Sequence, residues 1–129
     1  MVTEPTPTGT KTVLFVDDEP AISDGLRRIL RPFSDRWRVI TCNRAEEALA
    51  ILGTTPVDVV VSDLRMPEMD GVTLLKLVRE RHPLVARIVL SGSASSPAEA
   101  MAAAEVAHVR LDKPCSRDQL VAALQSAGT

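Results

Sequence analysis

The sequence predicts an α/β fold with three layers, in which a parallel β-sheet is covered by helices on both faces. Two observations support this prediction. Short apolar runs rich in β-branched residues alternate with segments whose apolar residues recur at helical spacing, and five such pairs follow one another after residue 10. Alternation of this kind is typical of βαβ units, whose right-handed crossovers place helices on both sides of the sheet.

Five apolar runs are predicted to be the strands. Residues 13–16 and 57–61 are the most strongly apolar and resemble strands buried in the middle of a sheet. Residues 38–41, 87–90 and 107–111 are weaker candidates. Residues 1–10 are rich in Pro and Thr and show no hydrophobic period, so we expect a loose tail followed by one domain over residues 11–129.

The segments between the strands show helix boundaries as well as helical periodicity. Pro20 suits the first turn of the first helix, Asn43 can cap the second, and Gly53 can end it. Ser96 precedes a proline and can open the fourth helix, and Ser116 begins a capping-box pattern for the fifth. The apolar faces carry Ile22, Leu26, Ile29 and Leu30, then Ala45, Ala48, Leu49 and Leu52, then Leu74, Leu75 and Val78, and finally Leu120, Ala123, Leu124 and Ala127.

Composition excludes several classes of protein. With 45% apolar and 25% charged residues the chain is neither disordered nor collagen-like, and its net charge of −2 argues against direct binding to nucleic acid. Cys42 and Cys115 form no CxxC or Cys/His cluster, which argues against a zinc site or a disulfide framework. The sequence shows neither a signal peptide nor an apolar run long enough to span a membrane, so we expect a soluble, cytoplasmic domain.

Polar residues gather at the predicted strand ends, where parallel α/β sheets bind ligands. Each group alone has an ordinary explanation, since Asp17 and Asp18 can cap a helix, Ser91 can lie in a turn and Lys113 can be a surface residue. Their combination at one edge of the sheet predicts a functional site instead. The groups are Asp17, Asp18 and Glu19 after the first strand, Ser62 and Asp63 after the third, Ser91 and Gly92 after the fourth, and Asp112, Lys113 and Pro114 after the fifth.

The chemistry of these groups points to phosphoryl transfer. The carboxylates of Asp17, Asp18 and Asp63 repel one another and need positive charge, of which Lys113 supplies only part. An oxygen-only site of this kind suits Mg²⁺. A carboxylate that attacks, a metal that neutralises developing charge, and the Lys113 and Ser91 side chains that hold phosphoryl oxygens together suit phosphoryl transfer.

From about residue 12 to 127, the chain resembles the receiver domains of two-component response regulators. The motifs that carry the resemblance are residues 16–19 (VDDE), 62–71 (SDLRMPEMDG), 90–92 (LSG) and 112–114 (DKP). The resemblance implies a flavodoxin-like fold with strand order 2-1-3-4-5. It also implies a signalling domain rather than an enzyme, one that catalyses only its own phosphorylation and dephosphorylation.

The resemblance further assigns roles to individual residues. It implies that Asp63 accepts the phosphoryl group, that Ser91 is the switch hydroxyl, and that Lys113 contacts the phosphate. It implies Mg²⁺ held by Asp18, Asp63 and the backbone carbonyl of Arg65, with Asp17 positioning the metal through water, and a cis peptide bond between Lys113 and Pro114. The implied partners are a sensor histidine kinase or a phosphotransfer protein, and an output domain or a second copy that meets the face made by helix 4, strand 5 and helix 5.

Two positions depart from the family pattern. Receivers usually carry Tyr or Phe three residues before the lysine, as a switch coupled to the hydroxyl, but this chain has Arg110 there and no Tyr at all. Arg65 and Ser93 stand at the two positions that tune phosphoryl lifetime in the family. The segments around Ser91 and Lys113 also resemble, more weakly, receivers attached to HDOD-type or HD-type output domains.

Two other hypotheses remain open at this point. A small Mg²⁺-dependent phosphatase with an aspartyl-phosphate intermediate also places an acid at a strand end, but it usually has a second acid two residues later, where this chain has Arg65, and a cap domain. A receiver-like interaction module without phosphorylation would be favoured by loss of the acids or of Lys113, all of which are present.

Overall fold

The computed structural model describes residues 10–66, 69–92, 96–113 and 115–128. Its five strands are all parallel and lie in the order β2-β1-β3-β4-β5, which confirms the predicted flavodoxin-like α/β fold. Along the chain the elements are β1 (Lys11–Val16), α1 (Pro20–Leu30), the 3₁₀ helix η1 (Arg31–Phe33), β2 (Trp37–Cys42), α2 (Ala45–Thr54), β3 (Val59–Asp63), α3 (Gly71–Arg81), β4 (Ala86–Ser91), α4 (Pro97–Val106), β5 (Val109–Asp112) and α5 (Arg117–Gly128).

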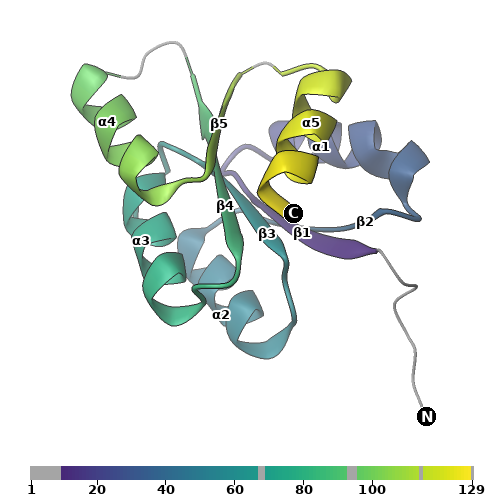
Figure 1. Cartoon of the computed structure of the whole chain (residues 1–129), viewed down its shortest axis with the longest axis horizontal. Coiled ribbons are helices and arrows are strands. Elements are labelled where there is room, and N and C mark those ends of the chain that lie inside the picture. Colours follow the sequence, from purple (N-terminus) through teal and green to yellow (C-terminus); the bar gives the residue numbers. More distant parts are fainter. Residues whose placement is uncertain (1–9, 67–68, 93–95, 114, 129) are drawn as a thin grey trace.

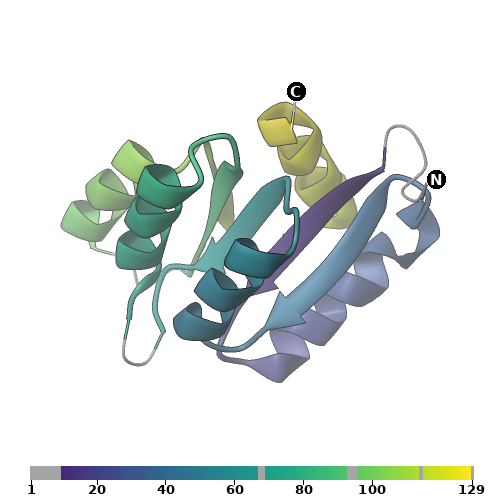
Figure 2. The same ribbon diagram turned by 90° about the horizontal axis from the view of Figure 1, so that it is seen from below.

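The sheet separates two layers of helices (Figures 1 and 2). Along β1, Val13 and Phe15 pack into a core with α1 and α5, whereas Leu14 and Val16 pack into a second core with α2, α3 and α4. Because successive side chains of a strand point to opposite faces, a strand covered on both sides must be apolar throughout. This explains why residues 13–16 of β1 and 59–61 of β3 are continuous apolar runs.

The third strand starts and ends two residues later than the sequence predicts. Asp58 precedes it, and its carboxylate accepts a hydrogen bond from the backbone N–H of Thr12 at 2.7 Å. Ser62 and Asp63 remain paired with Val89 and Leu90 of β4. Asp63 is therefore the last residue of a central strand, held in the ladder rather than in the following loop.

Two predicted boundaries of α2 are wrong. The helix begins after Arg44, whose side chain makes no cap hydrogen bond, so Asn43 is not its cap. Gly53 lies inside the helix, which runs on to Thr54, where the hydroxyl donates to the carbonyl oxygen of Ala50 at 3.2 Å. Asn43 turns instead to the end of β1, where its side-chain amide donates to the carbonyl oxygen of Asp17 at 3.1 Å.

Residues 1–9 of the predicted tail lie outside the described residues, and β1 begins at Lys11. Among the described helices, none combines the length and the apolar character needed to cross a membrane.

Candidate functional site

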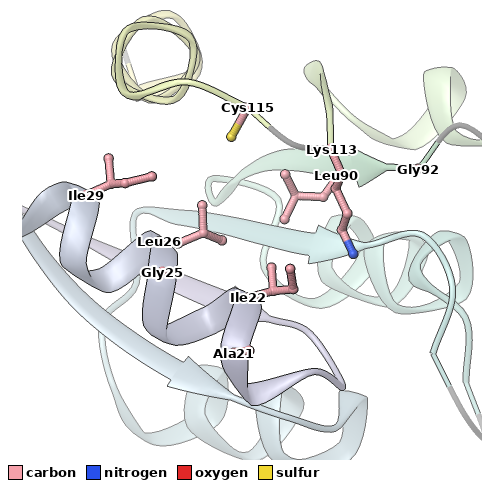
Figure 3. A pocket seen from close by; sticks show the side chains of 9 residues that line it. All are labelled: Ala21, Ile22, Gly25, Leu26, Ile29, Leu90, Gly92, Lys113 and Cys115. Carbon is pink, nitrogen blue, oxygen red and sulfur yellow. The ribbon is translucent and has the colours of Figure 1, made fainter.

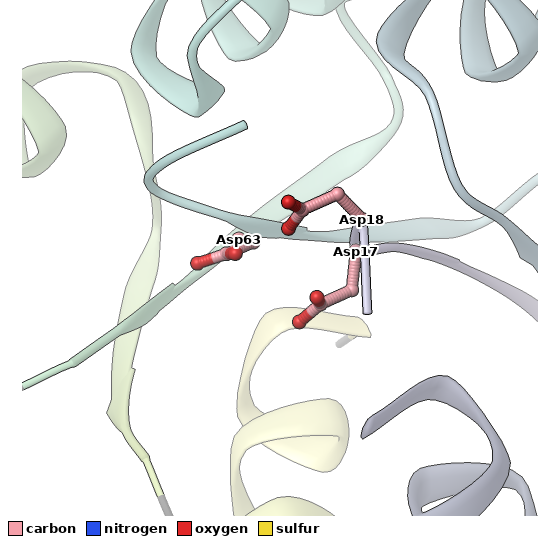
Figure 4. A group of neighbouring side chains, drawn as sticks. All are labelled: Asp17, Asp18 and Asp63. Atoms are coloured by element: carbon pink, nitrogen blue, oxygen red, sulfur yellow. The ribbon is translucent and has the colours of Figure 1, made fainter. Parts of the chain in front are cut away.

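Three aspartates meet at the carboxyl edge of the sheet (Figure 4). Asp17 and Asp18 directly follow β1, and Asp63 ends the neighbouring strand β3. One carboxylate oxygen from each residue lies within 4.8 Å of the other two. Asp17 is fully buried and Asp63 is 7% exposed, whereas Asp18 is exposed. The predicted acidic cluster is therefore present, and its outer member, Asp18, is open to solvent.

Lys113 is the cation of this cluster. Its Nζ lies 3.0 Å from Oδ2 of Asp17 and 3.1 Å from Oδ1 of Asp63. The residue directly follows β5, and its backbone N–H donates to the carbonyl oxygen of Ser91 at 2.8 Å, which fixes it beside β4. Burial disfavours the charged form of the lysine, but the hydrogen bonds and charges of Asp17 and Asp63 outweigh burial and raise the pKa of Lys113.

The pKa of Asp63 is subject to opposing effects. Burial raises its pKa above the ordinary value of 3.8, the hydrogen bond from Lys113 acts in the opposite direction, and the charge of Asp17 adds to the rise. Asp17 is better supported by the backbone, because its Oδ1 accepts a hydrogen bond from the N–H of Glu19 at 2.9 Å. The cluster thus holds Asp17, whose carboxylate accepts a backbone hydrogen bond, and Asp63, whose pKa burial raises despite the neighbouring Lys113.

An open cavity of about 360 Å³ lies in front of these groups. It is lined by Asp18, Glu19, Asp63, Leu64, Arg65, Gly92 and Lys113. Four acids, the three aspartates and Glu19, stand here against two cations, Lys113 and Arg65, and the possible metal donors of the aspartates are all oxygens. This donor set and the excess of negative charge fit Mg²⁺, which prefers carboxylate and carbonyl oxygens and completes its coordination with water.

Ser91 and Gly92 lie at the same edge of the sheet, but only one of them lines the acidic cavity. Ser91 ends β4 and is buried, and its hydroxyl donates to the carbonyl oxygen of Gly92 at 3.3 Å. Gly92, rather than Ser91, lines the acidic cavity. Pro67, Glu68, Ser93 and Pro114 lie outside the described residues, and with them the predicted cis peptide bond and the predicted lifetime position Ser93.

Arg65 contacts a residue, Glu99, that the sequence patterns do not place at this site. The backbone nitrogen of Arg65 lies 3.5 Å from Oδ1 of Asp63. Its guanidinium makes a bidentate contact with the carboxylate of Glu99 in α4: Nε lies 3.2 Å from Oε2, and Nη2 lies 2.7 Å from Oε1. Glu99 stands three residues after Ser96, and such an S-x-x-E pattern marks it as a capping-box acid. That pattern could have located Glu99 in the sequence, but not its partner Arg65.

A second cavity, of about 480 Å³, shares Gly92 and Lys113 with the acidic cavity (Figure 3). It is mainly apolar: Ile22, Leu26 and Ile29 of α1 face Leu90 and Cys115 across it. Burial raises the pKa of the Cys115 thiol, which agrees with a structural role and not with an activated thiolate. Cys42 is buried, unlike the half-buried Cys115, and burial raises the pKa of its thiol to about 11.

The face made by α4, β5 and α5 is polar at the position of the missing aromatic residue. Arg110 is exposed, and its guanidinium lies 3.2 Å from the carboxylate of Asp112 on the same strand. Met101 of α4 is 73% exposed, so the buried side of this helix is made by Ala103 and Val106.

Comparison with known proteins assigns the whole α/β domain, with its acidic motifs, to one family. The family model of the response regulator receiver domain matches residues 13–125. The chain belongs to this family. This receiver domain is a signalling domain that accepts phosphoryl groups, and the match does not favour the phosphatase hypothesis.

Relatives and solved structures agree with this assignment. The chain is 49% identical over 85 residues to the hydrogenase transcriptional regulatory protein HoxA of Cupriavidus necator, covering 66% of this chain and 17% of HoxA. It is 36% identical over 118 residues to the DNA-binding transcriptional regulator NtrC of Salmonella typhimurium, covering 89% and 24%. The signal receiver domain of an HD domain-containing protein from Pseudomonas fluorescens superposes with a TM-score of 0.85 at 29% identity, covering 92% and 94%. The chain thus spans a quarter or less of these two curated regulators.

Proposed function

We propose that Asp63 is the phosphoryl acceptor of this receiver domain. The observation that carries the proposal is the position of its carboxylate: it ends a central strand, faces an open polar cavity and lies 3.1 Å from Lys113 Nζ. Asp17 is enclosed, and Asp18 lies outside the ladder. Asp63 therefore combines access to a donor with a fixed backbone and a neighbouring cation.

The transfer step follows from these contacts. A carboxylate oxygen of Asp63 attacks the phosphorus of a phosphohistidine, the P–N bond breaks, and the leaving imidazole nitrogen keeps the electron pair and is neutral or takes up a proton. Lys113 compensates the charge on the phosphoryl oxygens, and the Ser91 hydroxyl is the nearby switch donor. Hydrolysis of the resulting acyl phosphate by water returns Asp63 to its free state.

Asp18, Asp63 and the backbone carbonyl of Arg65 would hold Mg²⁺, and Asp17 would position the ion through water. When bound, the ion supplies positive charge to the phosphoryl group during transfer. The proposed donor is a sensor histidine kinase or a phosphotransfer protein in the cytoplasm. The proposed recipient of the signal is an output domain or a second copy of this chain, reached through the face made by α4, β5 and α5.

Phosphorylation by a small donor tests the acceptor. Incubated with acetyl phosphate and Mg²⁺, the wild-type domain should gain the mass of one phosphoryl group, and peptide mapping should locate it at Asp63. Asp63→Asn should gain no phosphoryl group, because a neutral side-chain amide is not a nucleophile. Asp24→Asn, which makes the same change at an exposed acid of α1, should behave as the wild type. Wild-type labelling of Asp63→Asn would refute the assignment.

Mg²⁺ binding has a separate test that does not depend on phosphorylation. The ion should stabilise the fold because it relieves repulsion among the three aspartates, by about 2.7 kcal/mol at a hundredfold excess over its dissociation constant. Thermal unfolding in EDTA and in Mg²⁺ measures the effect. Asp18→Ala should lose most of the shift and Asp24→Ala should keep it, whereas equal midpoints for the wild type in both buffers would contradict the proposed metal site.

A further inference from the structure

An ion pair connects the phosphoryl-acceptor loop to the beginning of α4. Arg65 follows Asp63 by two residues, and its guanidinium contacts both carboxylate oxygens of Glu99, at 3.2 and 2.7 Å. The pair is exposed on both sides, with 58% of the Arg65 side chain and 35% of the Glu99 side chain accessible to solvent. Exposed ion pairs contribute only modestly to stability, with bidentate pairs such as this one at the upper end, so a more highly charged partner can compete for Arg65.

Glu99 is also part of the first turn of α4. Its Oε1 accepts a hydrogen bond from the backbone N–H of Ser96 at 2.9 Å, and the Ser96 hydroxyl accepts one from the backbone N–H of Glu99 at 3.1 Å. The carboxylate of Glu99 therefore joins the capping box of α4 to Arg65. Movement of the Arg65 side chain away from Glu99 removes this tie without removing the cap.

The two halves of α4 are held in different ways. Its buried residues, Ala103 and Val106, both lie in the second half. The last turn is also held by two arginines, because Arg79 donates to the carbonyl oxygen of Glu105 at 3.2 Å and Arg87 donates to that of Val106 at 2.6 Å. The first half depends on the capping box and on Arg65, so it is the half that a change at Asp63 can release.

Arg65 stands between Glu99 and the acidic cavity. Its guanidinium binds Glu99, and the residue lines the cavity together with Asp63 and Lys113. A phosphoryl group on Asp63 would bring about −1.5 to −2 charges at pH 7 and three strong acceptor oxygens into the cavity that Arg65 lines. Guanidinium–phosphate hydrogen bonds are among the strong, bidentate kind.

We propose that Arg65 is a charge-exchange latch: it binds Glu99 in the unphosphorylated protein and the phosphoryl oxygens after phosphorylation, which frees the first turn of α4. This inference rests on the proposed function of Asp63. The latch gives this chain a route from Asp63 to α4 that needs no aromatic residue at the position of Arg110. Glu99 and the phosphoryl group compete for one guanidinium, so each weakens the binding of the other.

Competition predicts that substitutions at Arg65 and at Glu99 change the affinity for a phosphoryl mimic in opposite directions. The probe is beryllofluoride, a phosphoryl mimic, titrated in the presence of Mg²⁺. Arg65→Gln should weaken binding because it removes a cation, although the backbone carbonyl is kept. Glu99→Gln should tighten binding about two- to fivefold, the factor that an exposed ion pair provides, because Arg65 no longer has to leave Glu99. Glutamine also serves in a capping box, so α4 stays capped.

Two controls separate the latch from simple loss of negative charge. Glu105→Gln removes an exposed acid at the other end of the same helix and should leave the affinity nearly unchanged. In the double variant Arg65→Gln/Glu99→Gln, the effect of Glu99→Gln should disappear, since there is no guanidinium left to compete for. If Glu99→Gln tightens binding equally with and without Arg65, or not at all, the latch is refuted.

The titration also separates failure of the latch from failure of the proposed function. Asp63→Asn should abolish beryllofluoride binding. If the wild type shows no binding at all in Mg²⁺, or Asp63→Asn binds as tightly as the wild type, the proposed function is overturned and the latch with it. If binding depends on Asp63 but Arg65 and Glu99 are not coupled, only the latch is overturned.

Discussion

Two helices begin in contact with the segment from Asp63 to Arg65, and they are held in place by different means. Both start with a side-chain cap, since Asp70 accepts from Thr73 at the start of α3 and Ser96 accepts from Glu99 at the start of α4. Gly71, the first residue of α3, is buried against the backbone of Asp63, where an added Cβ would collide with the carbonyl oxygen. Its N–H donates to the carbonyl oxygen of Leu64 at 2.8 Å.

The start of α4 has no comparable backbone contact among the described residues. Pro97 and Ala98 are exposed, and the tie to the acceptor loop is the ion pair of Arg65 with Glu99. Backbone packing cannot be exchanged for another partner, but an exposed ion pair can. The difference suggests that α3 fixes the acceptor while α4 responds to it.

The largest effect is expected at the start of α3. Gly71→Ala should lower the free energy of unfolding by about 3 kcal/mol, the upper end of overpacking costs, because the colliding atoms are backbone and cannot rotate away. Denaturant unfolding measures the change. Gly25→Ala in α1, where a Cβ meets nothing within 4 Å, should instead stabilise by about 0.5–1 kcal/mol. A tolerated alanine at residue 71 would mean that α3 is not locked to Asp63.

A smaller difference is expected between the N-cap of α3 and that of α4, in the stability lost when each cap is removed. Asp70→Ala should cost about 1 kcal/mol, the ordinary value for loss of an N-cap. Ser96→Ala should cost about half of that or less, because the first turn of α4 is weakly held and gains less from its cap. Ser116→Ala provides the matched control, since Ser116 caps α5 at 3.1 Å and Leu120 of that helix is fully buried. Equal losses at Ser96 and Ser116 would contradict the comparison.

The smallest effect concerns pH, and it has opposite signs at Asp63, which ends β3, and at Glu99 of α4. Burial raises the pKa of Asp63 above 3.8, so the ionised carboxylate costs stability at neutral pH, and this cost disappears as the pH falls below the raised pKa. Asp63→Asn should therefore raise the unfolding midpoint at pH 7, with a gain that shrinks in acid.

Glu99 should show the reverse. Its pKa is lowered below 4.5, first by the hydrogen bonds of Arg65 and then by that of Ser96, so its contribution is present above pH 4.5 and is lost as the pH falls through the lowered pKa. Glu99→Gln should lower the midpoint at pH 7 and have less effect in acid. Thermal melts of both variants from pH 7 downward test the pair, and shifts of the same sign at pH 7 would count against it.

The sequence predicts the acidic site well because the site follows from topology. Asp17, Asp18 and Lys113 directly follow parallel strands and Asp63 ends one, and such ends meet at one edge of the sheet. The boundaries of β3 could not be predicted in the same way, because Val57 continues the apolar run while Asp58 bonds to Thr12. The role of Asn43 was also missed, since its side chain turns to the end of β1 instead of capping α2.

The ion pair between Arg65 and Glu99 was beyond prediction for a different reason. The two residues are 34 positions apart, and neither periodicity nor capping rules relate one to the other. The start of α4 is visible in the S-x-x-E pattern, but the distance that brings it to Arg65 depends on how α3 and α4 pack. Local patterns predict which groups end strands and cap helices, whereas contacts between loops require the packed structure.

Hydrogen exchange in the wild type, with and without beryllofluoride and Mg²⁺, tests most directly whether α4 responds while α3 stays fixed. The backbone amides of the first turn of α4, residues 98–101, should exchange faster when beryllofluoride is bound, because Arg65 has left Glu99. Those of the first turn of α3, residues 71–74, should be unchanged or slower. Faster exchange at α3 with no change at α4 would contradict the assignment of a fixed helix and a responding helix.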